Sequence, residues 1–284
     1  MNVADMEEAV REDVRRALAE DVGNGDLSAS LVDPVRQATA SIVCREEALI
    51  CGQPWVNEVL RQVAPQAKAS WLLSDGQRCT PGQVIVQIQG PARELLTAER
   101  SSLNFLQMLS AVATQTDRYV QAVRGTRAAI VDTRKTLPGL RVAQKYAVRC
   151  GGGVNHRMGL YDAVLIKENH IAAAGGLSAA YRAASAMAAK ADFIEVEVET
   201  LKQLEEALQL GVKMLLLDNM PADTLHQAVA LARGRAVLEI SGGVTLDSVQ
   251  ALAQTGVDRI SVGALTKDIK AIDFSMRFQS RPVE

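Results

Sequence analysis

The sequence predicts an α/β protein whose larger part is a barrel of parallel β/α units with fewer than eight strands. From about residue 126 to residue 269, short apolar runs alternate with helical segments of about 10–15 residues. This rhythm is typical of parallel β/α units. The stretch before about residue 112 mixes helix and strand without that regular alternation. Because periodicity does not show whether a sheet closes, a doubly wound open sheet is the alternative architecture.

The first stretch begins with apolar residues at helical spacing over residues 4–20, which predict an amphipathic helix. Residues 38–44, ATASIVC, alternate as a strand does, and residues 75–90 place Gly and Pro turns around the alternating Val84, Val86 and Ile88. This second pattern predicts a hairpin. The sequence becomes helical again from Ala92 to Val123, with a break expected near Ala113–Thr116.

Six apolar runs of the second stretch are predicted as strands, and a short run at residues 151–155, GGGVN, makes a seventh. Signals for helix starts and helix ends lie between several of these runs. Thr200 and Gln203 predict a capping box, and Pro221 stands at a predicted helix start. Gly211 and Gly256 follow predicted helix ends. The six runs are AAIVDT (128–133), AVLIKE (163–168), FIEVEVE (193–199), MLLLDN (214–219), AVLEISGG (236–243) and DRISVG (258–263).

Composition and charge exclude several classes of protein. The 284 residues are 48% hydrophobic, and the net charge of −2 provides no general attraction to nucleic acid or to an anionic membrane. No apolar run is long enough for a transmembrane helix, and the acidic first segment does not resemble a signal peptide, so we expect a cytoplasmic protein. The four cysteines fit no zinc spacing, and we expect them to be reduced thiols.

Basic residues concentrate between Asp132 and His170. That window carries a charge of +4, whereas the rest of the chain carries −6, which indicates a pocket for an anionic small molecule. Functional groups of β/α barrels lie at the carboxyl ends of strands and in the loops that follow. Four basic residues occupy such positions: Arg134, Lys135, Arg157 and Lys167. Arg141, Lys145 and Arg149 recur at a spacing of four, so they could equally form a solvated helix face.

Two glycine-containing turns follow the last two predicted strands, where barrels commonly bind a phosphate group. They are Ser241-Gly242-Gly243 and Ser261-Val262-Gly263. Glu197 and Asp218 end adjacent predicted strands, and two carboxylates facing a basic mouth could hold Mg²⁺ or ribose hydroxyls. Glu195 shares a strand face with Glu197, and we interpret Glu195 as a structural residue that is paired inside the barrel.

Several longer segments resemble the quinolinate phosphoribosyltransferase family, in the expected order and over essentially the whole chain. These segments are ALAEDVGNGDLSAS (17–30), ERSSLNFLQMLS (99–110), DTRKTLPGLR (132–141), KYAVRCGGGVNHRMGLYDAVLIKENHI (145–171), EVEVET (195–200), LLLDNM (215–220), LEISGGV (238–244) and DRISVGALT (258–266).

The resemblance implies a type II phosphoribosyltransferase fold. Residues 1–112 would form an N-terminal α/β sandwich that the C-terminal tail 270–284 completes, and residues 113–269 would form an incomplete seven-stranded α/β barrel. The implied reaction transfers phosphoribosyl from phosphoribosyl pyrophosphate to quinolinate with decarboxylation, which yields nicotinate mononucleotide, pyrophosphate and CO₂. The family uses Mg²⁺ and forms homodimers or higher oligomers, with no nucleic-acid or membrane partner.

The resemblance also implies a role for each site residue. Arg134, His156 and Arg157 would surround the quinolinate carboxylates, and Arg100 would reach them from the partner subunit. Lys135 and Lys167 would lie near the substrate and the diphosphate-bearing sugar, with Thr133 beside them. Glu197 and Asp218 would reach the ribose and the metal, and Lys135, Glu197 and Asp218 are the expected catalytic residues. The 5′-phosphate would bind at Ser241, Gly242, Gly243, Ser261 and Gly263.

Two related readings remain open from the sequence. The first is a paralogue of the same fold with another substrate, such as the molybdenum-operon protein. The second is a nicotinate phosphoribosyltransferase, which would need only one carboxylate site and no decarboxylation.

Overall fold

The computed structural model describes residues 3–279 and divides into two compact units. The first unit contains residues 1–115, 137–151 and 268–284, and the second contains residues 116–136 and 152–267, although residues 1–2 and 280–284 lie outside the described part. The segment 137–151, which is expected from the sequence to belong to the barrel domain, therefore groups with the first unit. Within the described residues, no helix is long and apolar enough to cross a membrane.

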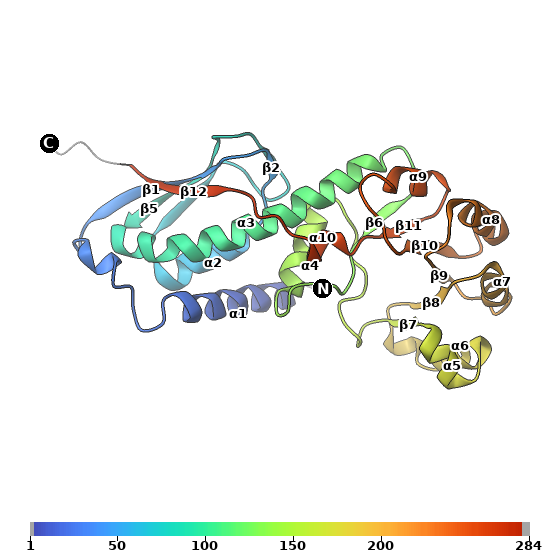
Figure 1. Ribbon diagram of the computed structural model, residues 1–284. Helices are drawn as coiled ribbons and strands as arrows, with labels where there is room; N and C mark the ends of the chain where they lie inside the picture. Colours follow the sequence, from blue (N-terminus) through green and yellow to red (C-terminus); the bar gives the residue numbers. More distant parts are fainter. Residues whose placement is uncertain (1–2, 280–284) are drawn as a thin grey trace. The chain divides into compact units, whose positions relative to one another are not determined.

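The first unit is an antiparallel sheet accompanied by helices (Figure 1). Its strands lie in the order β12-β1-β5-β3. Strand β1 pairs antiparallel with β12 and with β5, so that Ile42 faces Met276 on one side and Val86 on the other. The elements of this unit are α1 (Val3–Asp21), η1 (Ala29–Leu31), β1 (Gln37–Cys44), β2 (Ala48–Leu49), α2 (Gln53–Val63), β3 (Lys68–Trp71), β4 (Arg78–Cys79), β5 (Val84–Pro91), most of α3 (Ala92–Ala122), α4 (Arg141–Cys150) and β12 (Phe274–Phe278).

Strand β12 comes from the far end of the chain and pairs with β1 along five residues. Residues 274–278 of the C-terminal tail thus form an edge strand of the first sheet.

Two local predictions for the first unit are wrong. Residues 75–90 do not form a hairpin, because β4 pairs with β2 whereas β5 pairs with β1 and β3. Helix α3 runs without the break expected near Ala113–Thr116. Ala113, Thr114 and Thr116 are buried there, and the Thr114 hydroxyl accepts a hydrogen bond from the Leu49 amide. Such packing outweighs the low helix propensity of β-branched residues.

The second unit is a parallel sheet of six strands in the order β6-β11-β10-β9-β8-β7. Val154 adds a parallel bridge to Val131 on β6, so the predicted short seventh run takes the position beyond β6. The elements are β6 (Ala129–Val131), β7 (Val164–Ile166), α5 (Glu168–Ala174), α6 (Leu177–Ser185), η2 (Ala188–Lys190), β8 (Ile194–Val198), α7 (Leu201–Gln209), β9 (Met214–Asp218), α8 (Ala222–Ala232), β10 (Val237–Ser241), α9 (Val249–Gln254), β11 (Arg259–Ser261) and α10 (Ala264–Lys267).

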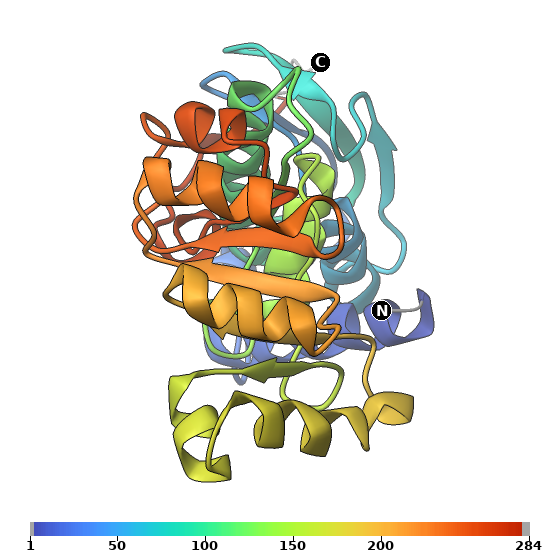
Figure 2. The same cartoon turned by 90° about the vertical axis from the view of Figure 1, so that its right-hand side faces the viewer.

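The connecting helices α6, α7 and α8 lie together on one side of strands β7–β10, and Figure 2 shows this alternation of helices and strands from a second direction. The arrangement agrees with an incomplete α/β barrel, in which helices cover the outside of the sheet. The predicted capping box at Thr200 is present: the Thr200 hydroxyl accepts from the Gln203 amide, and the Gln203 side chain reaches back to the Thr200 amide.

Candidate active site

A cavity of about 300 Å³ lies in the second unit at the carboxyl ends of its strands. Its walls come from the loops that follow β6 and the Val154 bridge, and from the strands β7 to β11. The lining residues are Asp132, Thr133, Arg134, Lys135, His156, Arg157, Leu165, Lys167, Glu197, Leu216, Ser241 and Ser261. The sheet therefore collects at one edge residues that are far apart in the sequence.

Asp132 fixes the segment that carries two of the predicted ligands. This carboxylate is fully buried, and it accepts hydrogen bonds from the Asn155 side chain at 2.6 Å and from the His156 amide at 2.8 Å. Strand β6 holds Asp132 in turn, because Val131 bridges Val154 on one side and pairs with Ser261 on the other. The Asn155–Arg157 segment thus reaches the cavity with a defined backbone.

Both ring nitrogens of His156 are occupied by protein partners. Nδ1 accepts a hydrogen bond from the Arg157 amide at 2.8 Å, and Nε2 lies 2.8 Å from a carboxylate oxygen of Glu195. A second buried carboxylate, Glu239, lies 3.6 Å from the same Nε2. Since Nδ1 is an acceptor, Nε2 carries the ring proton. His156 therefore links the cavity wall to a buried acidic pair.

The buried acidic pair is partly neutralised by cations. Arg259 Nε donates to Glu239 at 2.7 Å, and the Ser261 hydroxyl donates to the other oxygen of Glu239. Burial raises the pKa of Glu195 to about 7, against the opposing charge of Arg259. Burial, followed by the neighbouring Glu195, also raises the pKa of Glu239. The barrel interior beneath the cavity thus holds two carboxyl groups whose ionised forms are disfavoured.

Cationic groups crowd the cavity above this acidic pair. Burial lowers the pKa of the Arg157 guanidinium, and the nearby charge of Arg134 lowers it further. Lys167 Nζ forms an ion pair with Glu197 at 2.9 Å, as the parallel register of β7 and β8 predicts for neighbouring strand positions. Repulsion between cations in one small cavity is relieved when an anion binds. The geometry therefore favours an anionic ligand.

The carboxylates predicted at strand ends lie on neighbouring strands but differ in their surroundings. Glu197 on β8 lines the cavity, whereas Asp218, the last residue of β9, accepts a hydrogen bond from its neighbour Asn219 at 3.0 Å. Asp218 stands opposite Ser241 of β10 in the sheet register. The two carboxylates are thus brought to the same edge of the sheet, with Glu197 facing the cavity.

Backbone geometry explains two of the predicted glycines. Gly242 has a φ of +101°, and a Cβ atom at this position would lie 2.0 Å from the Asn219 side-chain oxygen. Gly263 has a different role, because a Cβ there would lie 3.2 Å from Lys135 Cδ. The Lys135 carbonyl also accepts a hydrogen bond from Thr266 at 2.8 Å, and the Lys135 amide donates to Thr133 at 3.1 Å. The absence of a side chain at Gly263 therefore leaves room for Lys135.

The structure brings nine of the predicted site residues into one cavity. They are Thr133, Arg134, Lys135, His156, Arg157, Lys167, Glu197, Ser241 and Ser261. Asp218, Gly242, Gly243 and Gly263 lie at the adjoining strand ends rather than among the lining residues. Arg100 is exposed on α3 in the first unit. The role of each residue in binding remains a prediction.

Several residues that support the site were not predicted from the sequence. Asp132 directly follows an apolar strand, which is a signal that could have separated it from surface acids. Glu239 and Arg259 are charged residues inside apolar strand runs, at positions where a solvated side chain would be unexpected. Leu165 and Leu216 form the apolar wall. Three other basic residues of the +4 window lie on α4 in the first unit, and Lys145 among them is fully buried rather than solvated.

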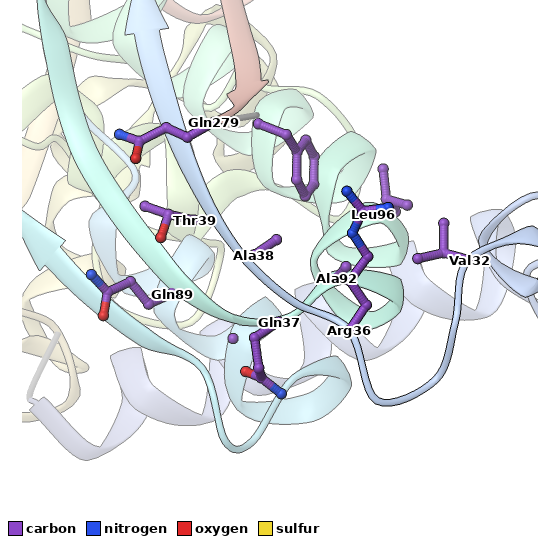
Figure 3. A pocket seen from close by; sticks show the side chains of 11 residues that line it. Val32, Arg36, Gln37, Ala38, Thr39, Gln89, Ala92, Leu96 and Gln279 are labelled. Carbon is purple, nitrogen blue, oxygen red and sulfur yellow. The ribbon is translucent and has the colours of Figure 1, made fainter. Parts of the chain in front are cut away.

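A larger cavity, of about 610 Å³, lies in the first unit and has a different chemistry (Figure 3). Its walls combine the amides of Gln37, Gln89 and Gln279 with apolar side chains. Among the described residues that line it, Arg36 is the sole charged side chain. This composition offers little to a polyanion, so size alone does not identify the active site.

Comparison with known proteins agrees with this geometry. The profile described as "Quinolinate phosphoribosyl transferase, N-terminal domain" matches residues 26–110, and the corresponding C-terminal domain profile matches residues 112–277. The chain is 44% identical over 276 residues to the nicotinate-nucleotide pyrophosphorylase [carboxylating] of Mycobacterium leprae, covering 95% of this chain and 97% of the relative.

A relative from Nicotiana glauca, quinolinate phosphoribosyltransferase [decarboxylating] 1, is 37% identical, with 94% of this chain and 81% of the relative covered. The solved structure of the nicotinate-nucleotide pyrophosphorylase from Francisella tularensis superposes with a TM-score of 0.93 at 46% identity. That match covers 96% of this chain and 97% of the relative.

Proposed function

Because the chain belongs to the quinolinate phosphoribosyltransferase family, we propose that it transfers phosphoribosyl from phosphoribosyl pyrophosphate to quinolinate and releases CO₂. The product is nicotinate mononucleotide, and pyrophosphate leaves. The observation that carries this function is the cavity in which Arg134, Lys135, Arg157 and Lys167 converge. Both substrates are polyanions, and four cations in one cavity offset their mutual repulsion.

Two arginines in the cavity wall are suited to bind a dicarboxylate such as quinolinate. A guanidinium offers a planar pair of N–H donors that matches a carboxylate, and Arg134 and Arg157 lie together in the cavity wall. Nicotinate lacks one of the two carboxylates and would leave one cation without its partner, at a cost of about 1–3 kcal/mol. We therefore expect selectivity for quinolinate over nicotinate of at least about fivefold.

Lys135, Lys167 and Glu197 act on the sugar side of the reaction in this proposal. Glycosyl transfer passes through a cationic ribose, and the Glu197 carboxylate can stabilise that charge when the ribose lies beside it. The ion pair with Lys167 holds the Glu197 side chain in place before substrate binds. Lys135, which lies against Gly263, offers its ammonium group to the anionic substrates.

Decarboxylation then requires little further chemistry from the protein. Once the ring nitrogen carries the ribose, it is cationic and stabilises the negative charge that CO₂ loss leaves on the adjacent carbon. The cavity residues have mainly to hold the carboxylate in place, which is a contribution of orientation.

We propose Mg²⁺ as the metal that accompanies phosphoribosyl pyrophosphate. The donor set fits this hard cation, because Glu197 and Asp218 offer carboxylate oxygens from neighbouring strands and Asp218 is partly exposed. Mg²⁺ usually keeps several waters and binds through one or two carboxylates plus substrate phosphates. When bound, it would neutralise charge on the diphosphate leaving group.

We further propose that the enzyme is a homo-oligomer, at least a dimer, in which Arg100 serves the partner subunit's site. Arg100 is an exposed cation on α3, which is consistent with an intermolecular contact. Random mixing of Arg100→Ala and Glu197→Gln chains would create heterodimers with one intact site, so about a quarter of wild-type activity should return. Differently tagged chains verify the exchange, and confirmed exchange without activity refutes the shared site.

The activity itself is tested by incubating the protein with quinolinate, phosphoribosyl pyrophosphate and Mg²⁺, and identifying the product by mass. Formation of nicotinate mononucleotide with equimolar CO₂ supports the proposal. Comparable kcat/KM on nicotinate would instead indicate the non-decarboxylating enzyme, and no turnover of either acid would indicate a same-fold paralogue.

A further inference from the structure

Two cysteines that are far apart in the sequence meet in the first unit. Cys51 directly precedes the N-cap residue of α2, and Cys150 is the last residue of α4. Their sulfur atoms and a carboxylate oxygen of Asp75 all lie within 4.8 Å of one another. Cys51 is fully buried, whereas Cys150 is partly exposed.

The backbone around both sulfurs is held by specific contacts. Ser110 on α3 accepts a hydrogen bond from the Cys51 amide at 3.0 Å and donates to the Cys51 carbonyl at 3.1 Å. Asp75 accepts from the Gln53 amide at 3.1 Å through one oxygen and from the Tyr146 hydroxyl at 2.7 Å through the other. The start of α2 and the last turn of α4 are therefore fixed against the same carboxylate.

These contacts favour thiol chemistry over metal binding at this cluster. Both oxygens of Asp75 already accept hydrogen bonds, so the third candidate ligand is engaged. Structural zinc sites use four protein ligands, and the cluster has three among the described residues. The two sulfurs are the groups that remain available for reaction.

The surroundings of the two sulfurs differ in a way that assigns them different roles. The hydrogen bond from the Cys51 thiol lowers the pKa of Cys150, and Tyr146 and Arg149 act in the same direction against burial and the charge of Asp75. Burial raises the pKa of Cys51. The thiolate is the attacking form of cysteine, so the partly exposed Cys150 is the one suited to react first.

We propose that Cys150 and Cys51 form a reversible disulfide site, in which Cys150 attacks a small-molecule disulfide such as oxidised glutathione and Cys51 resolves the adduct. In the first step the Cys150 thiolate bonds to one glutathione sulfur and the other glutathione leaves as a thiolate. In the second step the Cys51 sulfur displaces the bound glutathione, and the Cys51 proton ends on the glutathione that is released. The cysteines are oxidised, and one oxidised glutathione yields two reduced ones.

The cysteine pair is close in the sequence to the proposed active site. In the order of the chain, helix α4 follows the Asp132–Lys135 segment and precedes His156 and Arg157, and both segments contribute lining residues to the cavity. A disulfide at Cys150 would fix the chain five residues before Asn155. Disulfides in reducing compartments are usually transient or redox-sensing, which is consistent with a reversible bond.

A second thiol pair offers a matched control within the same chain. Cys44 and Cys79 also lie side by side, and the hydrogen bond between their thiols shifts the pKa values of the two groups apart. Both side chains are fully buried, so neither presents a sulfur to a molecule as large as glutathione. We expect this pair to stay reduced under conditions that oxidise the other.

The test treats the reduced full-length protein with oxidised glutathione without other oxidants. Free thiols, counted after denaturation, should fall from the initial four to two, and peptide mapping should find Cys51 joined to Cys150. Cys51→Ser should stop with one glutathione on Cys150, and Cys150→Ser should keep its three remaining thiols. Dithiothreitol should restore all four thiols in the wild-type protein.

Four retained thiols in the wild-type protein would overturn the proposal. So would a Cys44–Cys79 bond, an adduct on Cys51, or thiol loss from Cys150→Ser at the wild-type rate. The mapping of the wild-type protein needs no substitution, so the test stands even if a variant fails to fold.

Discussion

The buried carboxyl group of Glu195 makes the stability of the second unit depend on pH. Burial raises its pKa from 4.5 to about 7 in the folded protein, a shift of about 2.5 pH units. One unit corresponds to about 1.4 kcal/mol, so the full penalty for ionising this group is about 3 kcal/mol. Below pH 4.5 the group is protonated in both states, and the penalty vanishes. The penalty grows as pH rises towards 7.

The substitution Glu195→Gln removes the ionisation and keeps the size of the side chain. We compare the unfolding free energies of the variant and the wild-type protein at each pH. The variant's advantage over wild type should grow by about 2–3 kcal/mol as the pH rises from 5 to 8. Glu199, an exposed residue that directly follows β8, is the matched control, and Glu199→Gln should show no such change.

The measurement has to report on the second unit, because both tryptophans, Trp55 and Trp71, belong to the first. Hydrogen exchange of peptides covering β8 and β10, followed across a urea series at each pH, provides that signal. A difference between variant and wild type that does not change with pH would refute the argument. It would mean that Glu195 ionises with an ordinary pKa despite its burial.

Three further predictions concern the cavity. Gly263→Ala should lower kcat/KM at least about tenfold with little change in melting temperature, because the added Cβ would press on Lys135. Unchanged kinetics would show that Lys135 can move aside. Lys135→Ala and Glu197→Gln should each lower kcat/KM by about 10²-fold or more in steady-state assays while circular dichroism stays unchanged, and near-normal activity would make that residue structural. Asp132→Asn should reduce the unfolding free energy by about 1–3 kcal/mol, because one of the two buried carboxylate oxygens that accept hydrogen bonds is replaced by an NH₂ group. The same substitution should lower kcat/KM. Wild-type values for both quantities would contradict the positioning role.

The order of elements in the second unit followed from the sequence because its cause is local. Each strand of a β/α unit is a short apolar run, and each helix has its own capping signals, as the Thr200 capping box shows. Once the strands are parallel, their carboxyl ends must meet at one edge. The cavity residues Arg134, Lys167 and Glu197 could therefore be predicted together, although no contact between them was visible.

Tertiary structure alone decided which side chains pair within the two units. Glu195, His156, Glu239 and Arg259 form one buried network only because four separate chain segments converge inside the barrel. The contact of His156 Nε2 with Glu195 follows from that convergence, and a sequence pattern contains no information about it.

Strand pairing in the first unit was likewise not predictable from the sequence pattern. The pattern over residues 75–90 indicated two strands and a turn, but β4 found its partner in β2, because strand pairing depends on the free energy of long-range packing and not on proximity in the chain. Cys51 and Cys150 are a second example, since 99 positions separate two sulfurs that the fold brings together. Local periodicity determines which elements form, whereas the packing of their buried faces determines which side chains meet.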